Sequence, residues 1–338
     1  MSSKKIHTDP IKIKKITKIF KNYLSKSSIF LIVLILFLTL YQFTHRIFSN
    51  DYILDTTLKT NMYSRQCLYL NGNDNRLLGK LDNFYTSIDS RYLVPPIFFN
   101  NMPNSFSEEK DVNVKKSVYI HILLPILLKI QKESLKERSQ LIEINSRMLN
   151  EPLMEEDFVF LDNLAKKYKV KLGGDNFWNY VEAIDKLLLK VDVIPNSLTL
   201  AISAKETGWG TSRFLQEGNS LFSQWAWSSD KGIVPLLRKH GQTHVVRSFD
   251  SLEDSVRSFY LNINTHPAYK DFRETRRKMR VTEGHLKSKR LAPTLTKYST
   301  EEGYTDIISN IISSNSLERF DNYNEFSKKY RKICLSVL

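Results

Sequence analysis

Apolar positions recur with helical spacing through most of the chain after residue 111. This periodicity predicts one long helix over residues 112–149 and two shorter helices over Glu155–Tyr168 and Phe177–Lys190. The string YTDIISNIISSN near the C-terminus predicts a last helix. Within the first helix, VYIHILLPILLKI is too short to cross a membrane and contains a proline and a lysine. We therefore expect a buried helix there, with a kink at Pro125.

Two stretches break this helical pattern. Residues 46–111 contain Pro and Asn without any period, which predicts an irregular linker. GIVPLLRKHGQTHVVRSF is short and punctuated by turn residues, which predicts a small β-hairpin. After it, Ser251 and Asp254 have capping-box spacing and predict the start of another helix. The pattern is that of a mainly α (α+β) domain with one small β lobe.

An uncharged apolar segment lies near the N-terminus, over residues 27–44. As a helix its eighteen residues span about 27 Å, close to the roughly 30 Å of a bilayer's hydrocarbon core. Half of the chain's net charge of +14 precedes it, because residues 1–26 hold eight lysines and one aspartate. This arrangement predicts a transmembrane anchor with a cytoplasmic N-terminus and an exported C-terminal part. A cleaved signal peptide is the alternative, although FTHRIFSND offers no good small-x-small cleavage site.

Other potential reactive groups give weaker patterns. Cys67 and Cys334 would both be exported, where they form either a disulfide or two free thiols, and no histidine or motif accompanies them as it would a nucleophile. His240 and His244 are four apart on the predicted hairpin without further ligands, so no metal site is predicted. No Gly-rich phosphate loop follows a strand. We expect no cofactor.

The string AISAKETGWG carries a lone carboxylate at the end of an apolar helix. We expect this helix to begin at Asn196 or Ser197, whose side chains can cap it. Leu198, Ile202 and Glu206 are spaced by four and share one face, which should pack inward. The carboxyl group would then lie in the last helical turn beside apolar side chains. Burial and the negative end of the helix dipole both disfavour its charged form, so its pKa should be raised.

A carboxylic acid kept protonated near neutral pH is what a general acid needs to protonate a leaving oxygen. Gly208 and Gly210 allow a sharp turn directly after the helix. Trp209 between them can pack against the carboxyl group or offer a face to a sugar ring. The non-catalytic interpretation of the same string is a helix C-terminus with a half-exposed glutamate and a glycine stop.

Four strings follow one another in the second half of the chain: ETGWGTSRFLQEGNSLFSQWAW, GIVP, HVVRSFDSLEDSVRSFYLNINTHPAY and YSTEEGYTDIISNIISSN. Together they resemble the Bax-type glucosaminidase family, a branch of the bacterial peptidoglycan N-acetylglucosaminidases related to flagellar and autolysin enzymes. The resemblance runs from about Val193 to Asn315, and more weakly back to about Pro95. It implies a lysozyme-like helical fold with a small β lobe. The implied activity is that of an endo-β-N-acetylglucosaminidase, which hydrolyses the β-1,4 bond after N-acetylglucosamine in peptidoglycan strands.

The resemblance also implies roles for individual residues. Glu206 matches the family's catalytic acid, and a tyrosine of the string Tyr298-Ser-Thr-Glu-Glu-Gly-Tyr304 is associated with the site. Tyr304 is favoured and Tyr298 is the alternative, while a packed aromatic ring is the structural interpretation of either. Leu221 belongs to the motif GN-x-LF-x-QW, and core packing is the rival role for each of its residues, above all for Phe222. The residues expected to line the substrate groove are Trp209, Asn219, Phe222, Gln224 and Trp225.

One departure from the family concerns a second carboxylate. Many relatives place a second glutamate on the β lobe, but no Asp or Glu lies between Asp230 and Asp250. Glycosidases of the usual kind need two carboxylates. Asp230, Asp250, Glu253 and Asp254 are candidates, with capping the expected role of Asp254. A substrate-assisted mechanism, a lytic transglycosylase and a catalytically weak peptidoglycan-binding protein stay open as alternatives.

These features predict a single-pass protein of a bacterial inner membrane with a cytoplasmic N-terminus and a periplasmic catalytic domain. The expected partners are peptidoglycan glycan strands and the lipid bilayer, and no nucleic acid. The basic string RETRRKMR at 273–280 is expected to be a solvated helix face that attracts anionic wall polymer. The predicted segments are a basic tail at 1–26, a signal-anchor helix at 27–45, a linker at 46–111, a helical arm at 112–154, a glucosaminidase-like catalytic domain at 155–317 and a C-terminal tail at 318–338.

Overall fold

The computed structural model describes residues 68–70, 93–94, 96–173, 177–228, 232–236, 238, 241–323 and 325–326. Among them, no helix has both the length and the apolar character needed to cross a membrane. The predicted anchor at 27–45, both cysteines, Asp230 and His240 lie outside the described residues.

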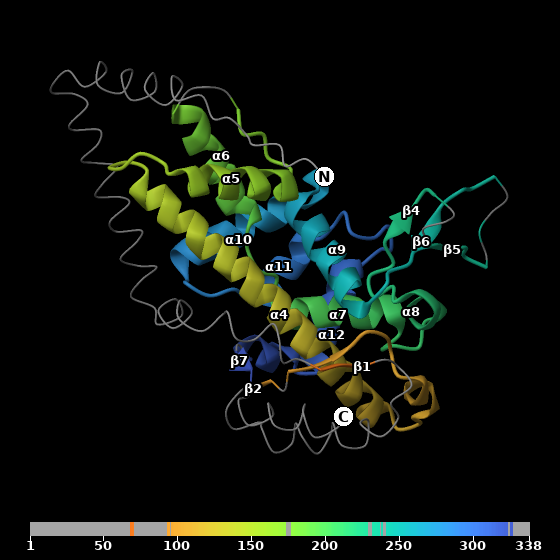
Figure 1. The fold of residues 1–338 in the computed structure, drawn as a ribbon. Coiled ribbons are helices and arrows are strands. Elements are labelled where there is room, and N and C mark those ends of the chain that lie inside the picture. Colours follow the sequence, from red (N-terminus) through yellow and green to blue (C-terminus); the bar gives the residue numbers. More distant parts are fainter. Residues whose placement is uncertain are drawn as a thin grey trace.

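Helices form most of the described chain (Figure 1). The longer ones are α4 (Val112–Arg147), α5 (Glu155–Tyr168), α6 (Phe177–Lys190), α7 (Asn196–Thr207), α9 (Leu252–Thr265), α10 (Lys270–Thr282) and α12 (Tyr304–Ser314). The short ones are α8 (Arg213–Gly218), α11 (Ser288–Leu291) and the 3-10 helices η2 (Asn104–Glu108), η4 (Pro267–Tyr269), η5 (Ala292–Thr294) and η6 (Leu317–Asn322). The predicted helices α4, α5, α6, α7, α9 and α12 are confirmed, and α4 continues through Pro125, which lies in its buried stretch.

A small antiparallel sheet stands to one side of the helices (Figure 1). Its strand order is β4 (Trp225–Ala226), β6 (Val245–Arg247) and β5 (Gly232–Ile233), with Trp225 opposite Val246. The predicted hairpin corresponds to β5 and β6, and β4 adds a strand that the turn pattern did not predict. Two parallel strand pairs lie elsewhere: β1 (Leu68–Leu70) with β3 (Ile97–Phe99), and β2 (Leu93–Val94) with β7 (Glu325–Phe326).

Buried apolar side chains of the described residues form two clusters. The first joins the N-terminal half of α4 to α7, α9 and α12, and the second joins the C-terminal half of α4 to α5 and α6. Helix α4 contributes to both clusters. The two cores therefore do not divide the chain at residue 154, where the predicted arm (112–154) ends and the predicted catalytic domain (155–317) begins. The first cluster surrounds α7 and therefore fixes the place of Glu206.

The C-terminal part of the predicted linker belongs to the core. Phe98, Phe99 and Phe106 are buried in the first cluster, and the carbonyl of Asn100 accepts a hydrogen bond from the backbone N–H of Leu252 at 2.8 Å. The interpretation of residues 46–111 as an irregular linker is therefore wrong for this part. Strand β3 is buried on both faces, so its side chains show no alternation that a pattern search can detect.

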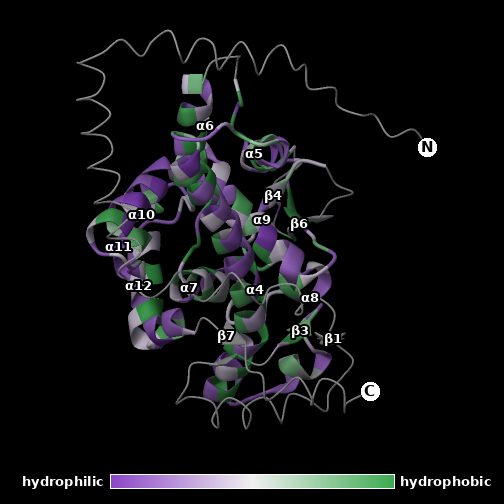
Figure 2. Ribbon diagram, turned by 60° about the vertical axis from the view of Figure 1, so that its left-hand side comes forward, coloured by the Kyte–Doolittle hydropathy of each residue, from purple (hydrophilic) through white to green (hydrophobic). Residues whose placement is uncertain are grey.

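Helix α10 is strongly hydrophilic (Figure 2), yet two of its arginines point inward. Arg276 is 1% exposed and donates to the carbonyls of Leu189 and Val193, at and beyond the end of α6, at 3.1 and 3.0 Å. Arg273 donates to the carbonyls of Ile263 and His266 at the end of α9. The predicted solvated face is thus wrong for these two residues, because they satisfy carbonyls at the ends of neighbouring helices.

Candidate functional site

Helix α7 carries the candidate acid and is buried on all sides. Three hydroxyls of α7 donate back to carbonyls of the preceding turn, as that of Thr207 does to the carbonyl of Ser203 at 2.7 Å, so they need no solvent. The predicted capping by Asn196 or Ser197 is wrong. Instead, Asp321 of η6 accepts hydrogen bonds from the backbone N–H and the hydroxyl of Ser197 at 2.8 and 2.6 Å. A residue distant in sequence thereby caps α7.

Glu206 lies half-buried in the last turn of α7, at the edge of the first cluster. The hydroxyl of Tyr304 donates a hydrogen bond to its Oε1 at 2.9 Å. Burial raises the pKa of the Glu206 carboxyl above its ordinary value, while hydrogen bonds from Tyr304 and Ser223 and the charge of Lys205 lower it in part. The net direction is upward, as the position on the helix predicts. Burial thus shifts the carboxyl equilibrium towards the protonated form, and the Tyr304 hydroxyl opposes this shift because it stabilises the anion.

Tyr304 and Tyr298 have different partners. Their rings stack with centroids 5.5 Å apart and an interplanar angle of 20°. Tyr304, at the start of α12, contacts the carboxyl group, whereas Tyr298 donates to the backbone carbonyl of Phe222 at 3.1 Å. Burial raises the pKa of both phenols, so both keep their protons. The geometry therefore gives Tyr304 the contact with Glu206 and gives Tyr298 a supporting position.

The turn after α7 has an unusual backbone. Gly208, Trp209 and Gly210 all have left-handed φ angles, of 56°, 56° and 88°. A Cβ atom on Gly210 would lie 2.6 Å from a ring carbon of Phe106, so this position needs glycine for space as well as for conformation. The ring of Trp209 packs edge-on against Tyr119 of α4, with centroids 5.9 Å apart. Helix α4 thus reaches the candidate site and holds Trp209 in place.

The predicted groove residues divide into supporting and exposed groups. Asn219 is buried, and its side-chain amide donates to the carbonyl of Phe249 at 3.1 Å. Phe222 is buried and stacks on Phe259 with centroids 4.0 Å apart, so it is a core residue. Gln224 is half-buried, and its Oε1 has no hydrogen-bond partner within the described residues. Trp225 is exposed on β4.

Two further groups near the carboxyl were not predicted. Ser223 has a left-handed φ of 48°, unusual for serine, and its side chain acts on the carboxyl of Glu206. Lys205 and Glu301 form an ion pair with a 2.8 Å distance, and both charges influence the pKa of Glu206. Ser223 was detectable only as the variable position of GN-x-LF-x-QW, and nothing in the local pattern marked Glu301.

The candidates for a second carboxylate are mostly engaged elsewhere. Glu253 pairs with Lys129 and Arg257, whose charges lower its pKa against the effect of burial. Asp254 accepts from the hydroxyl of Ser251, which caps α9 as predicted. Asp250 is exposed in the loop before α9. Glu206 is therefore the candidate site's half-buried acid, and no predicted candidate within the described residues is seen to contact it.

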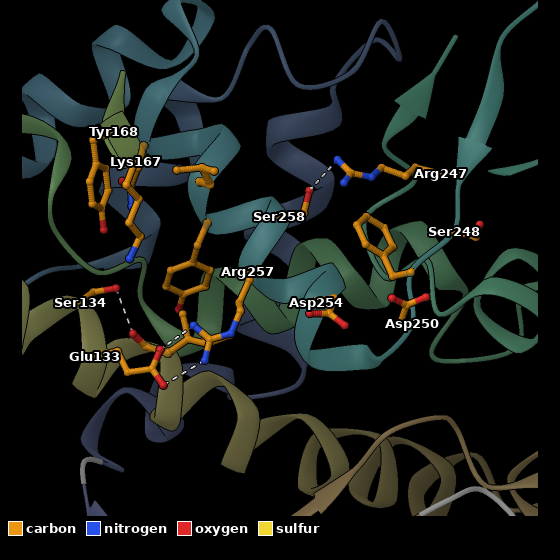
Figure 3. A pocket seen from close by; sticks show the side chains of 15 residues that line it. Glu133, Ser134, Lys167, Tyr168, Arg247, Ser248, Asp250, Asp254, Arg257 and Ser258 are labelled. Carbon is orange, nitrogen blue, oxygen red and sulfur yellow. Dashed lines mark hydrogen bonds and ion pairs between the residues drawn. The ribbon is translucent and has the colours of Figure 1, made fainter. Parts of the chain in front are cut away.

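A cavity of about 480 Å³ lies between α4, α9 and the loop after β6 (Figure 3). Its walls carry charges of both signs, but Arg257 is bound to Glu133, and Arg247 bonds the hydroxyl of Ser258. Asp250 and Asp254 line it, but the candidate acid Glu206 and both candidate tyrosines do not. We therefore assign the candidate site to the neighbourhood of Glu206 and not to this cavity. Across the described ranges, no group of three or more His, Cys, Asp or Glu side chains could hold a metal ion.

Comparison with known proteins identifies the type of domain that carries Glu206. The family model Glucosaminidase, described as mannosyl-glycoprotein endo-beta-N-acetylglucosaminidase, matches residues 181–317, which include Glu206 and Tyr304. The match identifies a glucosaminidase-like domain over residues 181–317. The chain is also similar to Protein bax of Escherichia coli (strain K12), with 29% identity over 190 residues. The predicted Bax-type resemblance and the prediction of a glycoside hydrolase domain are thereby confirmed.

The match is partial on both sides. It covers 55% of this chain and 64% of Protein bax, so the chain spans less than two thirds of the relative's length. No solved structure matches the chain significantly. The described part of this domain is mainly helical with a small antiparallel sheet, which agrees with the predicted mainly α (α+β) class.

Proposed function

We propose that the chain is a peptidoglycan hydrolase that cleaves the β-1,4 bond after N-acetylglucosamine, with Glu206 as the general acid. The observation that carries the proposal is the half-buried Glu206 carboxyl with a raised pKa, bonded to Tyr304 at 2.9 Å within a glucosaminidase domain. A protonated carboxyl delivers its proton to the glycosidic oxygen as the bond breaks. The Tyr304 hydroxyl then stabilises the resulting carboxylate by a charge-assisted hydrogen bond.

The engaged state of Glu253 and Asp254 favours a mechanism with one protein carboxylate. In a substrate-assisted reaction the acetamido oxygen of the substrate attacks the anomeric carbon, so that no protein nucleophile is needed. The same observation favours a lytic transglycosylase as the second candidate. That enzyme also works with one glutamate, but it leaves an anhydro sugar on muramic acid.

Product analysis separates these reactions. Purified peptidoglycan is digested with the detergent-solubilised full chain, and the soluble products are identified by mass spectrometry. The proposal predicts fragments with N-acetylglucosamine at a new reducing end. Anhydro-muramoyl products would assign the chain to the transglycosylases. Binding to peptidoglycan without any release would leave a catalytically weak wall-binding protein.

The proposal extends to location. The uncharged segment at 27–44 and the lysines before it support a single-pass anchor in the inner membrane, with the glucosaminidase domain in the periplasm. Reporter fusions test this topology. A reporter active only in the periplasm should work after residue 338 and fail when it follows residue 26, and the reverse result would refute the orientation. Immunoblotting of mature protein distinguishes an uncleaved anchor from a cleaved signal peptide.

A further inference from the structure

The β lobe carries two tryptophans whose rings face solvent. Trp225 is 63% exposed and Trp227 is 71% exposed. Leu236 and Val234, between β5 and β6, are exposed as well. Large apolar side chains that gather on a surface mark an interaction site more often than single ones do. Trp225 and Trp227, here called the tryptophan pair, therefore indicate a binding site for a ligand that packs on aromatic faces.

The tryptophan pair has a defined geometry. Its two rings are 6.3 Å apart and meet at 86°. His244 stacks on Trp225 with centroids 4.6 Å apart and an interplanar angle of 21°, which covers one face of that indole. His244 also meets Trp227 edge-on at 6.4 Å. Strand pairing holds Trp225 opposite Val246, so the two indoles form a preformed corner.

The chain connects this corner directly to the candidate site. The segment begins at Phe222, whose carbonyl accepts from Tyr298, and at Ser223, which acts on Glu206. An extended chain spans at most about 3.6 Å per residue. The Cα atom of Trp225 therefore lies within about 7 Å of that of Ser223, and the Cα atom of Trp227 within about 14 Å. A sugar strand that extends from a bond at Glu206 along this segment can therefore reach the tryptophan pair.

We infer that the tryptophan pair is a second carbohydrate site, which holds rings of the β-1,4-linked amino-sugar strand away from the bond that is cleaved. The inference rests on the proposed function and adds a length dependence to it. The apolar faces of pyranose rings pack on indole faces while their hydroxyl groups stay in water. A lipid surface is the competing occupant. Two indoles at 86° cannot both lie flat along one bilayer surface, whereas a strand that bends around a corner contacts both.

Calorimetric titration of an inactive enzyme tests the inference without hydrolysis. Full-length Glu206→Gln in detergent is titrated with the trisaccharide and the hexasaccharide of β-1,4-linked N-acetylglucosamine. Adding Trp227→Ala should weaken hexasaccharide binding by about tenfold and leave trisaccharide binding unchanged, since only the longer probe reaches Trp227. Trp227→Phe should restore most of the affinity because it keeps an aromatic face.

Trp178 on α6 provides the matched control, because it is 65% exposed and belongs to the other end of the molecule's helical part. Trp178→Ala should leave both affinities unchanged. Equal hexasaccharide binding with and without Trp227 would overturn the inference while leaving the proposed function intact. Failure of every variant to bind either probe would overturn both. After reconstitution into vesicles with brominated phospholipid, fluorescence quenching that disappears in Trp227→Ala would overturn the inference in favour of a lipid surface.

Discussion

The hydroxyl of Tyr304 lies 2.9 Å from Oε1 of Glu206, across 98 residues of sequence. Tyr304 is the first residue of α12 and Glu206 lies in the last turn of α7, and these two helices pack against each other in the first cluster. Burial disfavours the carboxylate, and the tyrosine favours it. Burial and the Tyr304 hydrogen bond therefore have opposite effects on the pKa of Glu206, and the effect of burial is the larger, so the pKa is raised.

Tyr304→Phe should remove the influence that lowers the pKa of Glu206. The pKa of the carboxyl should then rise further, since the anion loses a hydrogen bond. An acid that must be protonated loses activity as the pH rises through its pKa, so the basic limb of the kcat/KM profile should move to higher pH. The maximal rate should fall by about 10- to 100-fold, because a hydrogen bond to a charged group contributes about 1.5–3 kcal/mol.

Tyr298→Phe is the control for this prediction. Its hydroxyl bonds the carbonyl of Phe222 and not the carboxyl, so the basic limb should stay in place. Pre-steady-state and steady-state rates of the two variants are measured as a function of pH over the same range. A downward shift in Tyr304→Phe, or equal shifts in both variants, would contradict the assigned contact.

Gly210→Ala should destabilise the fold more than its conformation alone requires. The new Cβ atom would meet the ring of Phe106 at 2.6 Å, in addition to the strain at a φ of 88°. Gly241 offers a matched control, since its φ is 86° and nothing lies within 4 Å of an added Cβ. Gly241→Ala should cost about 1–2 kcal/mol, and Gly210→Ala should cost about 1–3 kcal/mol more. If urea unfolding gives equal losses in the free energy of unfolding for the two variants, the turn after α7 is not tightly packed.

Asp192 should be the carboxylate on which acid stability depends most. Burial alone would raise its pKa, but Arg280, Arg138 and Arg276 outweigh burial and hold the pKa well below its ordinary value. A lowered pKa in the folded state contributes stability above the unfolded pKa of about 3.9, and this stability is lost as the pH falls. Asp192→Asn should cost about 3–5 kcal/mol at pH 7, because it leaves buried guanidinium groups unpaired. The loss should shrink below about pH 4, where the unfolded wild type takes up a proton at Asp192 while the folded protein keeps the charge, so that the contribution of Asp192 to stability declines.

The exposed pair of Asp185 and Arg277 tests whether burial is the cause. Its atoms approach to 2.6 Å, closer than the 2.7 Å of Asp192 and Arg280, yet both side chains are about half exposed. Asp185→Asn should cost at most about 1 kcal/mol. Chemical unfolding at pH 7 and pH 4 measures both variants, and a comparable loss in the two would argue against a special role of Asp192.

Local patterns predicted what depends on nearby residues. Glu206 was placed correctly because helical periodicity determines which residues share a face with Leu198 and Ile202. The start of α9 was predicted because its cap, Ser251, is adjacent to it. A place for Tyr304 in the site was expected only through the family resemblance, and its hydrogen bond to Glu206 was not predicted, since no local pattern links residues 98 positions apart.

The errors have the same physical origin. The cap of α7 comes from Asp321, and the carbonyls that bind Arg276 come from the end of α6. Both are tertiary contacts, and composition suggested solvent or a neighbouring side chain in their place. Strand β3 was missed because a strand buried on both faces has no alternation. Ser223 lies at a variable position of its motif, so only its left-handed backbone marks it.

The role of Glu206 is tested most directly by Glu206→Gln in the full chain, with glycan release and thermal unfolding measured on the same preparation. Glutamine keeps the size of the side chain and an acceptor for the Tyr304 hydroxyl, but it has no proton to donate to a leaving oxygen. We predict that release of peptidoglycan fragments falls by at least about 10²-fold, the lower end of general acid catalysis, while the melting temperature changes little. Undiminished release, or a loss of stability that accounts for the lost activity, would show that Glu206 is a structural residue and not the acid.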